Sequence, residues 1–181
     1  MMSGPVRVEQ FAVLPAARLE GVWVLYQRAF GPLAGQAASR HVLDRAGFRA
    51  QMVDPSVIKL VVHQDDQPVS LLTLTFDVDT VSWVSADFYR ARYPTEAAGG
   101  NLMYITNMLT DPVYVGSAAF LLITEALNAL LPLGAVGFDI CGANVDRGLA
   151  TALHRRLLAL RGGAGDFEEL DTQTFYGLRV W

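Results

Sequence analysis

The sequence has one cysteine, Cys141, and one lysine, Lys59, among its 181 residues. A single cysteine excludes a framework of internal disulfides and a cysteine-rich zinc site. The three histidines, His41, His63 and His154, do not have the spacing of metal ligands. We therefore predict no metal site.

Charged residues are also few, at 18% of the chain, whereas 52% of the residues are hydrophobic. Such a chain can bury enough apolar surface to fold, which excludes intrinsic disorder. Fourteen basic and 18 acidic residues give a formal net charge of −4. This balance excludes a nucleic-acid binder with a broad basic surface, although it is compatible with a local pocket for a small anion.

No apolar run is long enough for a membrane span. The most apolar region, Pro112 to Phe138, is interrupted by Glu125 and Pro132 and lacks the roughly 18 uninterrupted apolar residues of such a span. The first residues of the chain carry charges and have no apolar core of signal-peptide length. We predict a cytoplasmic protein with a single domain over residues 1–181 and no membrane partner.

The pattern of apolar residues predicts both strands and helices. Alternating or β-branched runs indicate strands, and apolar residues at helical spacing between glycine or proline indicate helices. The predicted strands are Val6–Val13, Val57–Val62, Val69–Phe76, Leu102–Leu109, Ala135–Cys141, Phe167–Thr174 and Phe175–Trp181. The predicted helices are Pro15–Phe30, Ser39–Met52, Ser85–Arg92, Ser117–Leu131 and Asn144–Leu160.

The order of these elements predicts the fold class. The turn residues Asp65–Pro68 join two strands into a hairpin. A strand, a helix and a further strand over residues 102–141 imply a right-handed parallel crossover. We therefore predict an α+β fold with a mixed, mostly antiparallel sheet and helices on both faces.

The long connection over residues 78–100 contains several aromatic side chains, among them Trp83, Tyr89 and Tyr93. Long connections within compact domains are often functional covers over a site. The aromatic side chains either form the wall of a pocket for a substrate or pack the connection onto the sheet.

One segment carries a chemical signal. Gly116, followed by Ser117 and Ala118, comes just after a predicted strand and opens a predicted helix. Small residues there let a ligand approach the backbone, and the unpaired amides and helix dipole favour a phosphate. In the alternative interpretation, Gly116 only makes a turn and Ser117 only caps the helix.

The order of elements and this loop together resemble the GCN5-related N-acetyltransferase superfamily across nearly the full chain. The family's loop has the form Arg/Gln-x-x-Gly-x-Gly/Ala and follows a proline. Here Pro112 precedes the loop, and Gly116 and Ala118 keep its small positions. Val113 replaces the Arg or Gln, and Val115 replaces the basic residue that often precedes the glycine. Two side-chain contacts to phosphate are therefore missing.

The resemblance implies acetyl-CoA or another acyl-CoA as co-substrate. It implies that the diphosphate binds to the backbone amides of Tyr114, Val115, Gly116, Ser117 and Ala118. It also implies that the fourth and fifth strands splay apart, so that the main chain of Met108 and Leu109 pairs with the pantetheine arm. An amine would then attack the thioester directly, a reaction that rests on positioning and on proton transfer.

The family's general acid is commonly a tyrosine in the context Ala-x-x-Leu-Tyr. The matching stretch begins at Ala150 and places His154 at the tyrosine position; a histidine can donate a proton near neutral pH. In its alternative role, His154 is a structural residue on an amphipathic helix. Tyr176 is a second candidate donor. Asn144 lies near the position of the family's asparagine and is a candidate cofactor-binding residue.

No carboxylate lies on the predicted fourth strand, where the family often places its base. Thr106 and Asn107 are there instead. Asn107 is a catalytic candidate because its side chain can orient water, although it cannot accept a proton as a carboxylate does. Asp111 is interpreted as a turn residue before Pro112. Asp139 lies in an apolar strand and needs a partner if it points inward.

We predict an N-acyltransferase that moves an acetyl or longer acyl group to a small amine. The valines at positions 113 and 115 leave open a non-catalytic ligand-binding or interaction protein with the same fold. A further alternative is an acyltransferase that uses an acyl carrier protein as donor, for which Arg147, Arg155 and Arg156 would contribute a basic recess. The last predicted strand contains the aromatic residues Phe175, Tyr176 and Trp181. They line either the same end of the sheet as the aromatic connection over residues 78–100 or a homodimer contact.

Overall fold

The computed structural model describes residues 5–35, 42–114, 118–130, 134–141, 148–175 and 179. Its strands are β1 (Val6–Phe11), β2 (Val57–Gln64), β3 (Gln67–Thr75), β4 (Leu102–Thr110) and β5 (Ala135–Phe138). Its α-helices are α1 (Ala16–Phe30), α2 (Arg45–Val53), α3 (Ala86–Arg92), α4 (Pro94–Ala98), α5 (Ala118–Leu130) and α7 (Leu149–Leu160). Short 3-10 helices are η1 (Gly31–Gly35), η2 (Val78–Thr80) and η3 (Pro112–Tyr114).

The strands form one sheet in the order β1-β2-β3-β4-β5. The first four strands pair antiparallel, and β5 pairs parallel with β4. The sheet is therefore mixed and mostly antiparallel, which confirms the predicted fold class. No helix within the described ranges has both the length and the apolar character that crossing a membrane requires.

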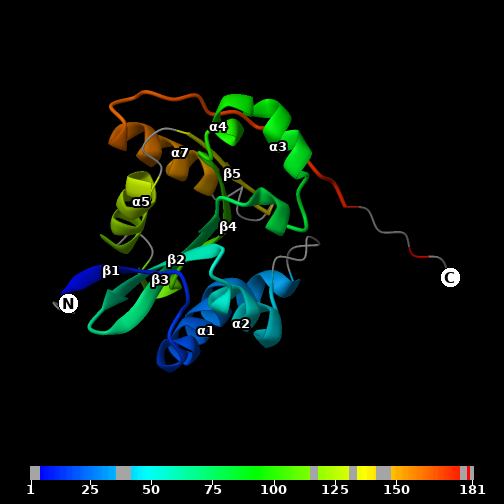
Figure 1. Ribbon diagram of the computed structural model, residues 1–181. Coiled ribbons are helices and arrows are strands. Elements are labelled where there is room, and N and C mark those ends of the chain that lie inside the picture. The colour runs from blue at the N-terminus through cyan, green and yellow to red at the C-terminus, as the bar shows by residue number, and fades with distance from the viewer. Residues whose placement is uncertain are drawn as a thin grey trace.

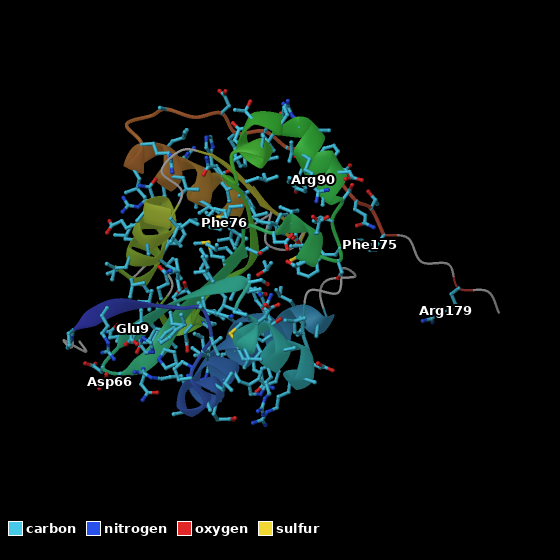
Figure 2. All side chains as sticks on the ribbon, viewed as in Figure 1. Glu9, Asp66, Phe76, Arg90, Phe175 and Arg179 are labelled. Carbon is cyan, nitrogen blue, oxygen red and sulfur yellow. The ribbon has the colours of Figure 1, made fainter. Side chains whose placement is uncertain are left out.

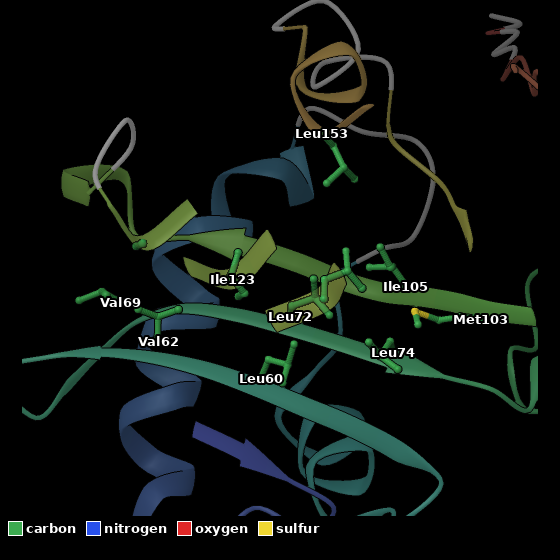
Figure 3. Close-up of a cluster of buried hydrophobic side chains, with 11 residues drawn as sticks. Leu60, Val62, Val69, Leu72, Leu74, Met103, Ile105, Ile123 and Leu153 are labelled. Carbon is green, nitrogen blue, oxygen red and sulfur yellow. The ribbon is translucent and has the colours of Figure 1, made fainter. Parts of the chain in front are cut away.

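Helices cover both faces of the sheet (Figure 1). Side chains alternate between the two faces of a strand. Leu72 of β3 accordingly packs in a core with α5 and α7, whereas its neighbour Leu71 packs in a second core with α1 and α2. Figure 3 shows Leu72 and other strand residues of the first core on the side of Ile123 and Leu153, which come from α5 and α7. The central strands are apolar on consecutive positions because both of their faces are buried.

Local chemistry sets the ends of several elements. Asp65 and Asp66 both have positive φ angles, 50° and 64°, which suits a two-residue hairpin turn between β2 and β3. The Asp44 carboxylate accepts a hydrogen bond from the Gly47 N–H at 2.7 Å and caps α2. The helix predicted from Ser39 therefore begins only at Arg45, and residues 42–44 are not helical.

The C-terminal part differs from the prediction. Residues 164–175 form no strand, so the strand predicted over Phe167–Thr174 is wrong. This segment binds to the end of α3 through side chains instead: Glu168 pairs with Arg92, the last residue of α3, and accepts a hydrogen bond from the hydroxyl of the next residue, Tyr93. Figure 2 shows Phe175 beyond α3, on the segment that leads away from the sheet. Of the last predicted strand, only Phe175 and residue 179 are among the described residues.

Candidate functional site

Strand β4 continues past the point where its pairing with β5 ends. Their pairing runs from Leu102 opposite Ala135 to Ile105 opposite Phe138, where β5 ends. Residues 106–110 of β4 continue past that point, and within the described ranges β5 is the last strand on that side. The main chain of this part of β4 therefore offers an open edge beside the end of β5, as the resemblance implies.

A β-bulge lies at the start of this open edge. Thr73 of β3 is opposite Asn107, and the next residue, Leu74, is opposite Ile105, so Thr106 is the extra residue of β4. A bulge breaks the alternation of side chains and re-aims them. Both Thr106 and Asn107 consequently reach Thr73, with Oγ1–Oγ1 and Nδ2–Oγ1 distances of 2.7 and 2.9 Å.

The bulge is fixed by a polar contact to α2. The Gln51 amide nitrogen donates to Thr106 Oγ1 at 3.1 Å, and Asn107 Nδ2 donates to Gln51 Oε1 at 2.7 Å. With its bond to Thr73, Asn107 uses both N–H groups of its side chain inside the protein, and the residue is only 7% exposed. The Asn107 side chain thus holds the bulge to α2 and β3, and its catalytic role stays a prediction.

Main-chain groups along β4 point alternately toward β3 and toward the open edge. The Asp111 N–H donates to the Val69 carbonyl at 2.9 Å, and the Leu109 carbonyl accepts from the Ser70 hydroxyl at 2.7 Å. Both groups are thus directed toward β3. The alternation then directs the main chain of Met108 toward the open edge. The sequence led us to expect that the main chain of Leu109 pairs with pantetheine, but that main chain faces β3 instead. For Met108 the same role stays a prediction.

The segment after β4 is held by Asp111, whose carboxylate is buried. Its Oδ1 accepts from the Val113 N–H at 3.0 Å, and its Oδ2 accepts from Arg28 of α1 at 3.2 Å. Asp111 is therefore the turn residue expected from the sequence. The Tyr114 N–H donates to the Asp111 carbonyl at 2.8 Å. That amide is occupied, which removes Tyr114 from the expected N–H donors to a diphosphate.

Several expected site residues remain predictions. Ala118 is the first residue of α5, at the helix end expected to face the diphosphate. The residues of the expected site that lie outside the described ranges are Val115, Gly116, Ser117, Asn144, Arg147 and Tyr176. Arg156, expected in a basic recess, is paired instead with Glu125 of α5 at 2.6 Å.

His154 lies on α7, half-buried, and is placed beside the end of β5 by aromatic contacts. Its ring stacks on Phe167 with centroids 4.3 Å apart and planes at 10°. Phe167 in turn stacks on Phe138, the last residue of β5, at 6.3 Å. Stacking covers a face of the imidazole, whereas the nitrogen atoms lie at the ring edge. The contact is compatible with proton donation, and the catalytic role of His154 stays a prediction.

The sequence interpretation missed an aromatic and acidic group at the end of β5. Asp139, the residue after Phe138, accepts hydrogen bonds at Oδ1 from the Tyr104 hydroxyl at 2.5 Å and from Trp83 Nε1 at 3.1 Å. Burial, followed by the nearby Asp139 charge, raises the pKa of Tyr104. The only sequence signal was a lone acid in an apolar run, which needed a partner that the sequence could not name.

The chain was compared with family models, with curated proteins and with solved structures. No family model matches the chain, and no curated protein matches it. Several solved structures are similar, and three of them are described here. AAC(6')-Iy in complex with the bisubstrate analogue CoA-S-monomethyl-acetylneamine has a TM-score of 0.55 and 13% identity, covering 97% of this chain and 99% of that one.

The second is an aminoglycoside acetyltransferase from an uncultured soil metagenomic sample in complex with sisomicin, with a TM-score of 0.53, 16% identity and coverage of 96% and 97%. The third is a GCN5-related N-acetyltransferase from Ralstonia eutropha, with a TM-score of 0.52, 14% identity and coverage of 94% and 99%. Identities this low establish the fold alone. The chain has the fold of the GCN5-related N-acetyltransferases, as the order of its elements predicts.

Proposed function

We propose that the chain is an acyl-CoA-dependent N-acyltransferase that transfers an acetyl or longer acyl group to a small amine. The open edge of β4 beyond Ile105, next to the end of β5, carries this proposal. A pantetheine arm has amide groups that can pair with an exposed strand edge. A similar fold holds a CoA-containing bisubstrate analogue in one of the compared structures, which supports acyl-CoA as the donor.

The chemistry asks little of the protein beyond positioning and proton transfer. The amine nitrogen forms a bond to the thioester carbon, the carbon–sulfur bond breaks, the nitrogen loses one proton and the sulfur gains one. We assign proton donation to the sulfur to His154, with Tyr176 as the second candidate. The main chain of Met108 orients the donor, and the bulge fixed by Asn107 keeps this edge in place.

Two measurements test the function. Acetyl-CoA or a longer acyl-CoA should raise the melting temperature, because a ligand that binds only the folded state stabilises it. Free CoA should appear when a panel of small amines is added with the donor. Neither effect with any donor would refute the proposal, whereas binding without CoA release would indicate a non-catalytic protein of this fold.

The His154→Gln variant tests the proton donor. We expect a fall in kcat of roughly 100-fold, in the range typical of general acid catalysis. Phe167→Leu is the matched control, because it removes the stacked ring and keeps the imidazole. If His154→Gln keeps the kcat of the wild type, His154 is not the proton donor. Tyr176 is then the candidate, and Tyr176→Phe tests it.

A further inference from the structure

The end of β5 carries a fixed carboxylate that the proposed reaction does not use. Asp139 is exposed, and its Oδ1 receives one bond from the fully buried Tyr104 and one from Trp83. Both of these groups donate, and the carboxylate oxygen accepts from them. The two bonds hold the carboxylate in place at the end of β5.

Aromatic rings surround this charge. The Trp83 ring is 37% exposed, and Tyr89 packs edge-on against Tyr104 with centroids 5.6 Å apart. Aromatic faces attract ammonium groups, with tryptophan the most effective of them. An exposed tryptophan beside an anchored carboxylate is a common arrangement for binding an organic cation.

The segment that contains Trp83, between β3 and the end of α3, carries a net negative charge, as Asp139 does. Between β3 and the end of α3 the chain carries Asp77, Asp79 and Asp87 against two cations, Arg90 and Arg92. Arg90 pairs with Asp79 and Asp87, and Arg92 pairs with Glu168, so acidic groups already compensate both positive charges. The surface near Trp83 therefore attracts cations.

The Asp139 carboxylate lies at the end of β5, next to the open edge of β4. Asp139 directly follows Phe138, where β5 and its pairing with β4 end. We propose that Asp139 and Trp83 bind an ammonium group of the acceptor, a group other than the amine that reacts. The inference rests on the proposed function and narrows its substrates to amines that carry a second positive charge.

Nuclear magnetic resonance of the Trp83 indole N–H tests this site directly, because that group donates to Asp139. The signal is assigned with Trp83→Phe. Titration with 1,4-diaminobutane should shift it saturably, whereas 1,4-butanediol, which has the same length and no charge, should not. An equal shift with the diol, or no shift with the diamine, would overturn the proposal.

Variants separate the site from general charge effects. Asp139→Asn should abolish the response, and Asp79→Asn, which removes the same charge from the same region, should keep it. In the acyl-transfer assay Asp139→Asn should raise KM for diamines at least about threefold while kcat changes little, since an exposed ion pair contributes modestly. Unchanged dispersion of the other amide signals checks that Asp139→Asn is folded, and a retained diamine response in that folded variant would contradict the site.

The two proposals fail differently. The titration contains no acyl donor, so a diamine response without CoA release would refute acyl transfer and leave the cation site in place. CoA release without a Trp83 response would refute the cation site alone.

Discussion

Tyr104 of β4 stands directly opposite Gly137 of β5, and its ring covers the space that a side chain at position 137 would take. A Cβ atom at Gly137 would lie 2.9 Å from Tyr104 Cδ2 and 2.6 Å from Tyr89 Cε1. The glycine therefore lets both rings approach the strand. From this position the Tyr104 hydroxyl reaches Asp139, two residues further along the chain.

Substitution of Gly137 by alanine should destabilise the protein. The added methyl group must displace two buried rings, which we expect to lower the free energy of unfolding by about 1–3 kcal/mol in urea titrations. The matched control is Gly31→Ala, because no atom lies within 4 Å of a Cβ there and the backbone is helical. If both variants unfold at the same urea concentration, the close approach at Gly137 has no energetic consequence.

Substitution of Asp111 by alanine should release the segment after β4. It removes the acceptor for the Val113 N–H and the partner of Arg28. Loss of a buried acceptor should lower the free energy of unfolding by about 1–3 kcal/mol and speed hydrogen exchange at Val113. Arg28→Ala should cost about 0–1 kcal/mol, because its side chain is 65% exposed and water can replace it. Equal effects of the two variants would contradict this ranking.

The free energy of unfolding should increase with pH between about pH 8 and 10, because Lys59 loses its proton at lower pH in the folded state than in the unfolded state. The Lys59 ammonium is buried and donates to the Ala12 carbonyl at 2.7 Å and to the Asp54 carbonyl. Burial lowers its pKa to about 8. The unfolded lysine keeps its proton to higher pH, so within this window the unfolded state binds more protons and raising the pH favours folding.

Urea midpoints measured across this range check the prediction, and Lys59→Met should remove the rise. Above about pH 10 the trend should reverse in both proteins, because burial raises the pKa of Tyr26 to about 12 and its folded state then binds more protons than the unfolded state. A rise that persists in Lys59→Met would show that another group titrates.

Proline at position 108 should weaken binding of the acyl donor while preserving the sheet. Proline lacks an N–H, and the main chain of Met108 faces the open edge, where no β3 bond is lost. We expect Met108→Pro to lose the thermal shift with acetyl-CoA and to retain strand content in circular dichroism. Leu109→Pro is the control, because it removes a main-chain group on the β3 side and should unfold the sheet. A full thermal shift in folded Met108→Pro would exclude this residue from donor binding.

The sequence by itself determined most of the elements, because their signals are local. The apolar stretch Val57–Val62 and the turn at Asp65 and Asp66 predicted the hairpin that the structure shows. Ser85 predicted the start of α3, which it caps. Such signals depend on the few residues that make each turn or helix end, so they can be read without the rest of the chain.

Only the tertiary structure decided how the residues of the candidate site are placed. The bulge at Thr106 turned Asn107 toward Gln51, and the pairing of β4 with β3 separated Met108 from Leu109. Asp139 gained its partners from residues 35 and 56 positions away in the chain. Strand register and contacts between distant segments depend on the free energy of the whole packed molecule, and no short run of sequence contains that information.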